Sequence, residues 1–187
     1  NIEGLGGDVL TDTYGTMGAT SRPGVFVAGA AIGPETIDDS IAQANAAALN
    51  AIADATSGVV TATLAAGSLA SFAGLTTGSA DAITISVTDD NGTSLAATDL
   101  STLGGKTSET VTVANAVEIT GTAAQVTAAL VTASTLVVAG SATVTINDLT
   151  GTSITATTLS AIGGATSGTV TVSNAVSISG SVAELTT

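Results

Sequence analysis

The feature that most constrains the fold of this chain is a tandem repeat, in which residues 82–128 align with residues 141–187. The two copies share 24 identities in 47 aligned positions, and the alignment places Asn115 on Asn174. A unit of this size cannot bury an apolar face by itself, so neighbouring copies are expected to stack against one another. The repeat therefore predicts an extended architecture built by unit-on-unit packing.

An older, incomplete copy precedes the two clear ones. The segment LAAGSLASFAGL at 64–75 resembles EITGTAAQVTAAL in the first full copy, but the match needs a gap. Each full copy also contains two smaller units, because TVTINDLTGTSITATTLSAI at 143–162 resembles TVTVSNAVSISGSVAELTT at 169–187.

Each small unit begins with alternating β-branched residues, such as VTV at 111–113, which is typical of a half-buried strand. A turn of Asn, Asp or Gly follows, and then a short segment with leucines three apart, such as Leu100 and Leu103, that predicts a short helix or a 3₁₀ turn. The clearest helix is predicted at 122–130, with Thr122 as its N-cap.

These patterns predict a mixed, β-rich fold in which strand-plus-short-helix or strand-plus-turn repeats stack in an elongated, solenoid-like array, preceded by a strand–loop–helix segment. A row of small β-sandwich modules is the alternative. The expected divisions are an opening segment at 1–57, a partial repeat at 58–81, a first repeat at 82–140 and a truncated second repeat at 141–187.

The charge of the chain excludes several classes of function. Arg22 and Lys106 are the only basic residues, against fifteen acidic ones, and the formal net charge is −13. Nucleic acids and anionic membrane surfaces need clustered cations, so neither is an expected partner. The sequence has no cysteine and no histidine, which removes disulfides, Cys/His zinc sites and His-based catalytic triads.

The least polar window, at 122–140, approaches the length of a membrane span. Its threonines and Gln125 argue against a span, as does Glu184 in the equivalent stretch of the second copy, so no membrane span is expected. The chain begins at Asn1 and ends inside a stretch that the repeat predicts to be helical. We therefore expect both ends to be cuts through a longer or processed polypeptide.

Charged residues differ between the two copies while apolar residues, Gly, Thr and Asn persist. Asp99 aligns with Thr158, and Lys106 aligns with Ala165. A catalytic carboxylate that repeated with its fold would not be lost so freely. The comparison predicts a scaffold with no catalytic residues, in which Lys106 is a solvated side chain.

Two polar pairs do persist between the copies. Asp89 aligns with Asp148, and the turn TDDNGT at 88–93 offers carboxylate and amide oxygens of the kind that calcium binds. A plain turn is the preferred interpretation, since Asp, Asn and Gly favour turns and the second copy keeps only Asp148. Asn115 and Asn174 are expected to bond neighbouring backbone in a stacked ladder.

The opening segment has a different character. GVFVAGAA at 24–31 is an apolar run of strand length, and a helix is predicted after Pro34, with Thr36 as a candidate cap. The spacing places one stripe along this helix, formed by Ile37, Ile41, Ala44, Ala48 and Ile52. Helix N-termini attract phosphate, but acidic residues already occupy this first turn.

The stretch TSRPGVFVAGAAIGPETIDDSIAQANAAA at 20–48 resembles the closing strand–loop–helix of the FAD domain in the heterodisulfide reductase family and related flavoproteins. The resemblance implies FAD as a cofactor, with Gly29, Ala30, Ala31, Gly33, Pro34 and Ile37 near it. The rest of that family's pattern is missing. GLGGDV at 4–9 is the only approach to the dinucleotide fingerprint, and it lacks the third glycine and the preceding strand.

Residues 60–187 resemble tandem repeats of very long bacterial surface and haemolysin-like proteins, of the kind found in cyanobacteria. This resemblance implies a structural or adhesive role outside the cell. We therefore expect a non-enzymatic structural repeat protein of a secreted fibre, surface layer or adhesin, with no resident cofactor, whose partners are other copies or neighbouring repeats of a longer chain. The alternative is a fragment of an FAD-dependent oxidoreductase that completes a flavin site supplied by another chain.

Overall fold

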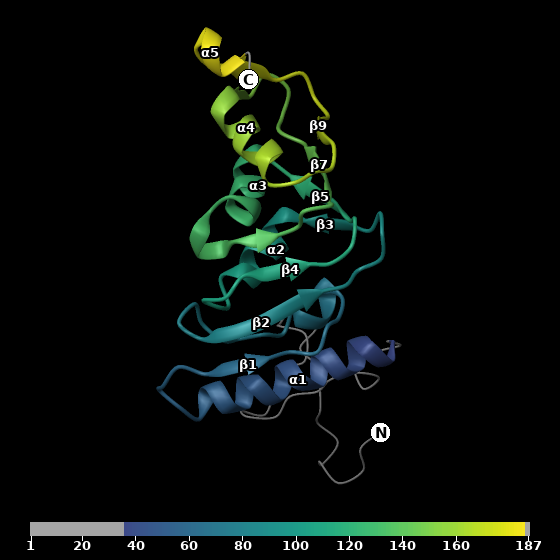
Figure 1. Cartoon of the computed structure of the whole chain (residues 1–187), viewed down its shortest axis with the longest axis vertical. Helices are drawn as coiled ribbons and strands as arrows, with labels where there is room; N and C mark the ends of the chain where they lie inside the picture. The colour runs from purple at the N-terminus through teal and green to yellow at the C-terminus, as the bar shows by residue number, and fades with distance from the viewer. Residues whose placement is uncertain (1–35, 186–187) are drawn as a thin grey trace.

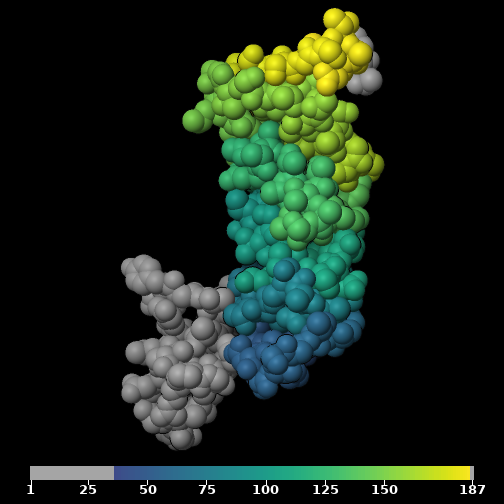
Figure 2. Space-filling model, turned by 90° about the vertical axis from the view of Figure 1, so that its left-hand side faces the viewer, coloured from purple at the N-terminus to yellow at the C-terminus, as the bar shows by residue number. Residues whose placement is uncertain are grey.

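The computed structural model describes residues 36–185, which form a mixed α/β structure with parallel sheets (Figure 1). The molecule is an elongated column, and its residues follow one another in chain order from one end to the other (Figure 2).

The strands of the described residues belong to three sheets, and every pair is parallel. The first sheet has the order β1-β2-β4-β6: β1 (Thr61–Thr63), β2 (Ala82–Val87), β4 (Val111–Val113) and β6 (Val137–Val138). The second has the order β3-β5-β7-β9: β3 (Ser94–Ala96), β5 (Glu118–Gly121), β7 (Thr143–Ile146) and β9 (Val170–Val172). The third pairs β8 (Ser153–Thr155) with β10 (Ser177–Ser179).

The helices connect these parallel strands. Those of the described residues are α1 (Ile37–Asp54), α2 (Ala97–Gly104), α3 (Ala123–Leu130), α4 (Ala156–Gly164) and α5 (Val182–Leu185), with short 3₁₀ helices η2 (Leu69–Phe72) and η3 (Ala133–Thr135). In the upper part of the column α3, α4 and α5 lie along one side and β5, β7 and β9 along the other, whereas α1, β1 and β2 cross its lower part (Figure 1). Helix α2 packs against α3, and α3 packs against α4. Parallel strands need such crossovers, because a tight hairpin can join only antiparallel strands.

The chain returns to the same sheet at a nearly constant interval. Ile85 of β2 lies opposite Val111 of β4, and Val144 of β7 lies opposite Val170 of β9, so the two returns span equal lengths of chain. The interval is shorter at the start, where Thr61 of β1 lies opposite Ala82.

Several backbone hydrogen bonds occur twice, at equivalent positions of the two copies. Ser108 N–H donates to Asp81 O at 2.7 Å, and Ser167 N–H donates to Gly140 O at 2.9 Å. A side-chain bond recurs in the same way, because Thr107 donates its hydroxyl to Ile83 O and its counterpart Thr166 donates to Ala142 O. Some of the residues that the two copies share therefore form hydrogen bonds between one strand layer and the preceding layer.

The core is a continuous layer between the strands and the helices, aliphatic except for Phe72. Its fully buried side chains include Ile83, Leu100, Ile119, Val126 and Ile146. Alternate strand residues point into it, as expected for strands with one buried face, and the short helices bury their leucines or valines against it.

Helix α1 forms as predicted, but it packs by a different face from the stripe that the spacing singled out. The stripe residues Ile37, Ile41, Ala44, Ala48 and Ile52 are all exposed. The buried face consists of Ala42, Ala46 and Leu49, flanked by Gln43 and Asn50. Small side chains let the helix approach the loop at Gly67 closely, since a Cβ added at Gly67 would lie 2.6 Å from the Ala42 Cβ.

The strands and short helices predicted inside the repeat are largely confirmed. VTV at 111–113 is β4, Leu100 and Leu103 are buried on α2, and α3 starts after Thr122 with a capping box completed by Gln125. The β-sandwich alternative does not fit, because such sandwiches are antiparallel and the strands of residues 36–185 pair in parallel. Nowhere in that range is there a helix both long and apolar enough to traverse a bilayer.

Candidate functional site

Most of the residues that the flavoprotein resemblance placed near FAD lie outside the described residues. These are Gly29, Ala30, Ala31, Gly33 and Pro34. Ile37 is the first residue of α1, and its side chain is 79% exposed. The described part of the chain therefore brings none of these candidates together into a pocket.

The N-terminus of α1 is occupied by the protein's own groups. Thr36 is the N-cap, as predicted, and its hydroxyl oxygen accepts from Asp39 N–H at 3.1 Å. The Asp39 carboxylate accepts from Ser68 N–H at 2.7 Å and from the Ser71 hydroxyl at 2.7 Å. Burial alone would raise the pKa of Asp39, but hydrogen bonds from Ser68, Ser71 and Thr36 outweigh it and lower the pKa to about 2. This first turn carries a fixed negative charge, which disfavours a phosphate there.

The two aspartates that the copies share make structural hydrogen bonds. Asp89 Oδ2 accepts from Leu69 N–H at 2.7 Å, at the start of η2. Asp148 Oδ2 accepts from Ala123 N–H at 2.6 Å, at the start of α3. Among the described residues no group of three or more acidic, His or Cys side chains is placed to hold a metal ion. The two hydrogen bonds fit the turn interpretation of these aspartates.

The two shared asparagines bond neighbouring backbone, as predicted. Asn115 Nδ2 donates to Asp89 O at 2.8 Å, and Asn174 Nδ2 donates to Asp148 O at 2.7 Å. Each asparagine therefore holds the turn of the preceding layer in place.

The last layer of the column presents an apolar end, which we call the open end and define by strands β9 and β10 and by the side chains of Ile178 and Leu185. Strands β9 and β10 are the outermost strands of their sheets. Ile178 is 49% exposed, whereas its counterpart Ile119 is fully buried. Leu185 is 53% exposed, whereas its counterpart Val126 is fully buried. The open end carries core-type side chains that the described structure leaves half-exposed.

Two equivalent glycines, one in α2 and one in α4, also differ in whether other groups pack against them. A Cβ added at Gly104 of α2 would overlap the backbone carbonyl oxygen of Thr135, because η3 lies against that helix. A Cβ added at the counterpart Gly163 of α4 would have no neighbour within 4 Å among the described residues. A depression of about 580 Å³ lies here, lined by residues of α4 and by Ile178 and Leu185. The surface that η3 covers in the first copy is therefore left uncovered in the second by the residues that the structure describes.

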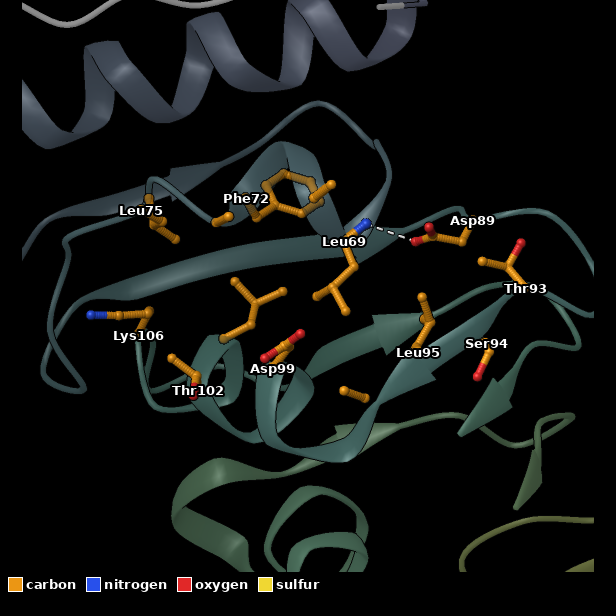
Figure 3. Close-up of a pocket in the computed structure, with 14 residues that line it drawn as sticks. Leu69, Phe72, Leu75, Asp89, Thr93, Ser94, Leu95, Asp99, Thr102 and Lys106 are labelled. Carbon is orange, nitrogen blue, oxygen red and sulfur yellow. Dashed lines mark hydrogen bonds between the residues drawn. The ribbon is translucent and has the colours of Figure 1, made fainter. Parts of the chain in front are cut away.

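A separate hollow of about 440 Å³ lies between η2 and α2 (Figure 3). Leu69, Leu95 and Leu103 contribute apolar walls, and Asp99 and Lys106 contribute charge. Lys106, expected to be a solvated side chain, is half-buried at this hollow. Sequence reasoning missed the hollow, although the gap in the partial copy is a signal that one layer is shorter than the others.

Comparison of the chain with family models, with curated proteins and with solved structures finds no match. Because no relative points to a site, the two candidate sites are those found in the structure itself: the open end and the hollow. The chain has no histidine or cysteine, and the carboxylates of Asp39, Asp89 and Asp148 are all engaged by backbone N–H groups.

Proposed function

We propose that this protein is a non-enzymatic structural repeat protein of a secreted fibre, surface layer or adhesin, whose β-rich units stack in a solenoid-like array. Its function would be to bind a further repeat unit at the open end. The protein would act outside the cell or on its surface, and other copies of the repeat would be its partners. No catalytic step is assigned to it.

The observation that carries the proposal is the difference in exposure between equivalent positions of the two copies. Ile119 of the first copy is buried where the second copy stacks on it: β7 of the second copy pairs with β5, and α4 of the second copy packs against α3. In the second copy, the equivalent Ile178 and Leu185 are half-exposed. The first copy thus supplies a template for what the open end accepts: a further layer with a parallel strand and a helix. An exposed strand edge beside apolar side chains is the usual basis for strand addition.

At the other end of the described column, α1 packs on the next layer through the same kind of close glycine contact as the repeat helices. Gly121 lies against Ala97 of α2, and Gly180 lies against Ala156 of α4, with added Cβ atoms 3.0 and 3.1 Å from those side chains. Gly67 makes the equivalent close approach to Ala42 of α1. Helix α1 therefore makes the contact with the following layer that a repeat helix makes elsewhere in the column.

An extended chain tests the stacking directly. Because Thr187 aligns with Ala128, appending residues 129–187 after Thr187 continues the repeat in register. We expect the extended protein to have a higher melting temperature and to protect the amides of β10 from hydrogen exchange. A matched control appends the same segment in scrambled order. If the ordered extension leaves β10 exchange unchanged, the open end does not accept a further layer.

Self-association is tested on the unextended 187-residue chain by sedimentation velocity over a range of concentrations. We expect concentration-dependent association that Ile178→Asp abolishes. Leu149→Asp is the control, because Leu149 is 81% exposed and its counterpart in the first copy, Asp90, is already an aspartate. Monomers at all concentrations would contradict assembly by this chain alone, while the extension experiment would still decide whether units stack.

A further inference from the structure

The hollow between η2 and α2 arises because one layer of the column is shorter than the others. The stretch of chain from Thr61 of β1 to its partner Ala82 is shorter than the stretch from Ile85 to its partner Val111 in the same sheet. The missing residues fall in the helical segment. Asp89 caps the four-residue η2 in the way that Asp148 caps the eight-residue α3.

The equivalent place in the next copy shows what the hollow lacks. There, α3 packs along α4, and its second turn buries Ala129 and Leu130. Helix η2 is too short to cover α2 in the same way, so within residues 36–185 one flank of α2 and the adjacent edge of β3 are left lining the hollow. The hollow has the size of a small-molecule site, since such sites usually measure roughly 300–1,000 Å³.

The charges of the hollow are specific to this layer. Asp99 and Lys106 both line it, and the second copy has Thr158 and Ala165 at these positions, where α3 covers α4. Figure 3 shows the Asp99 carboxylate directed toward Leu69, while the Lys106 ammonium lies at the opposite side and points away from Asp99. The hydrogen bond that Asp99 accepts from the Thr98 hydroxyl is long, at 3.5 Å, so the carboxylate oxygens retain capacity to accept.

Asp89 adds a second carboxylate at the other end of the hollow. Its Oδ2 accepts from Leu69 N–H, and it lies on the wall shared with Thr93 and Leu95 (Figure 3). Two carboxylates thus line the hollow, together with one lysine whose ammonium points away from Asp99. The net charge of −13 adds a field that attracts cations and repels anions.

We propose that this hollow binds a small organic cation with an apolar body. The cationic group lies at Asp99 and is stabilised by the nearby charge of Asp89. The apolar body packs on Leu69, Leu95 and Leu103, in the space that the second turn of a full-length helix fills elsewhere. This inference does not depend on the proposed structural role, because the hollow is remote from the open end along the chain.

Binding is tested by amide chemical-shift titration of the full chain with three probes of similar shape. These are 2-phenylethylammonium, neutral 2-phenylethanol and anionic phenylacetate. We expect the cation to bind with a Kd of about 1 mM or tighter, as is usual for ligands of this size, and to shift amides of η2, β3 and α2. The neutral probe should bind at least about tenfold more weakly, and the anion should not bind.

Substitutions taken from the other copy supply matched variants that preserve the fold. Asp99→Thr should weaken binding of the cation about tenfold, since it removes the charged partner. Lys106→Ala should leave binding unchanged or strengthen it, because it removes a like charge. Thr158→Asp is the control, as it places a carboxylate at the equivalent position of α4, outside the hollow between η2 and α2.

The outcomes separate the proposal from its competitors. Equal binding of cation and neutral probe would show an apolar groove without charge recognition and would overturn the proposal. Tighter binding of phenylacetate, lost in Lys106→Ala, would reassign the hollow to anions. No shift of η2, β3 and α2 amides at several times the expected Kd would exclude a small-molecule site.

Discussion

Asp148 accepts a 2.6 Å hydrogen bond from the backbone N–H of Ala123, the first residue of α3. The two residues belong to successive layers of the column, so this carboxylate supplies a hydrogen-bond acceptor to the start of α3 from the next layer, in addition to the N-cap Thr122. Asp89 makes the same bond to Leu69 at the start of η2. The aspartate that both copies retain therefore joins each layer to the helix before it.

This geometry predicts a large cost for removing Asp148. Asp148→Ala leaves the N–H of a buried helix start without its partner, and Asp148 is only 9% exposed. We expect the free energy of unfolding to fall by about 1–3 kcal/mol, as measured by urea denaturation. Asp90→Ala is the control, because Asp90 is exposed and lies beside the other capping aspartate, and it should change stability by less than about 0.5 kcal/mol. Equal effects of the two substitutions would refute the capping role.

Much of the repeat could be predicted from its sequence, because its signals are local. The VTV run at 111–113, the cap Thr122 and the leucines of α2 each determine structure within a few residues. The backbone contacts of Asn115 and Asn174 are predictable for a similar reason, since an amide repeated with a turn usually bonds the backbone beside it.

The buried face of α1 could not be predicted from spacing alone. The isoleucines mark the most hydrophobic stripe, but the loop at Gly67 leaves no room for them, and Ala42 fits because it is small. Steric fit decided the packing of this helix, and steric fit depends on a residue far along the chain. The role of Asp39, which bonds Ser68 and Ser71, is hidden from the sequence for the same reason.

Close approach at Gly67 predicts that Gly67→Ala loosens α1 from the column. The added methyl would lie 2.6 Å from Ala42 Cβ, so the helix or the loop must move. We expect a loss of about 1–3 kcal/mol, together with faster hydrogen exchange of the α1 amides. Gly78→Ala is the control, since a Cβ there has no neighbour within 4 Å among the described residues. Unchanged exchange in α1 after Gly67→Ala would show that the helix docks without this contact.

The hydrogen bonds of Asp39 predict a specific acid dependence. Because its pKa is lowered from 3.8 to about 2 in the folded protein, its stabilising contribution is present above about pH 4 and is lost as the pH falls toward 2. The difference in free energy of unfolding between the natural protein and Asp39→Asn should therefore shrink over that window. Asp38→Asn removes the same formal charge from an exposed neighbour and is the matched control. Parallel curves for the two variants would argue against the role of Asp39 in holding α1.

The paired positions Ile119 and Ile178 give the sharpest measurement of layer stacking. Ile119 is fully buried between strands and helices, so Ile119→Ala should lower the free energy of unfolding by about 2–5 kcal/mol. Ile178 occupies the equivalent place at the open end and is 49% exposed, so Ile178→Ala should cost less than about half as much. In the chain extended by residues 129–187, the added layer should cover Ile178, and the cost of Ile178→Ala should rise toward that of Ile119→Ala. If the two costs stay apart in the extended chain, the open end and the internal interface are not equivalent surfaces.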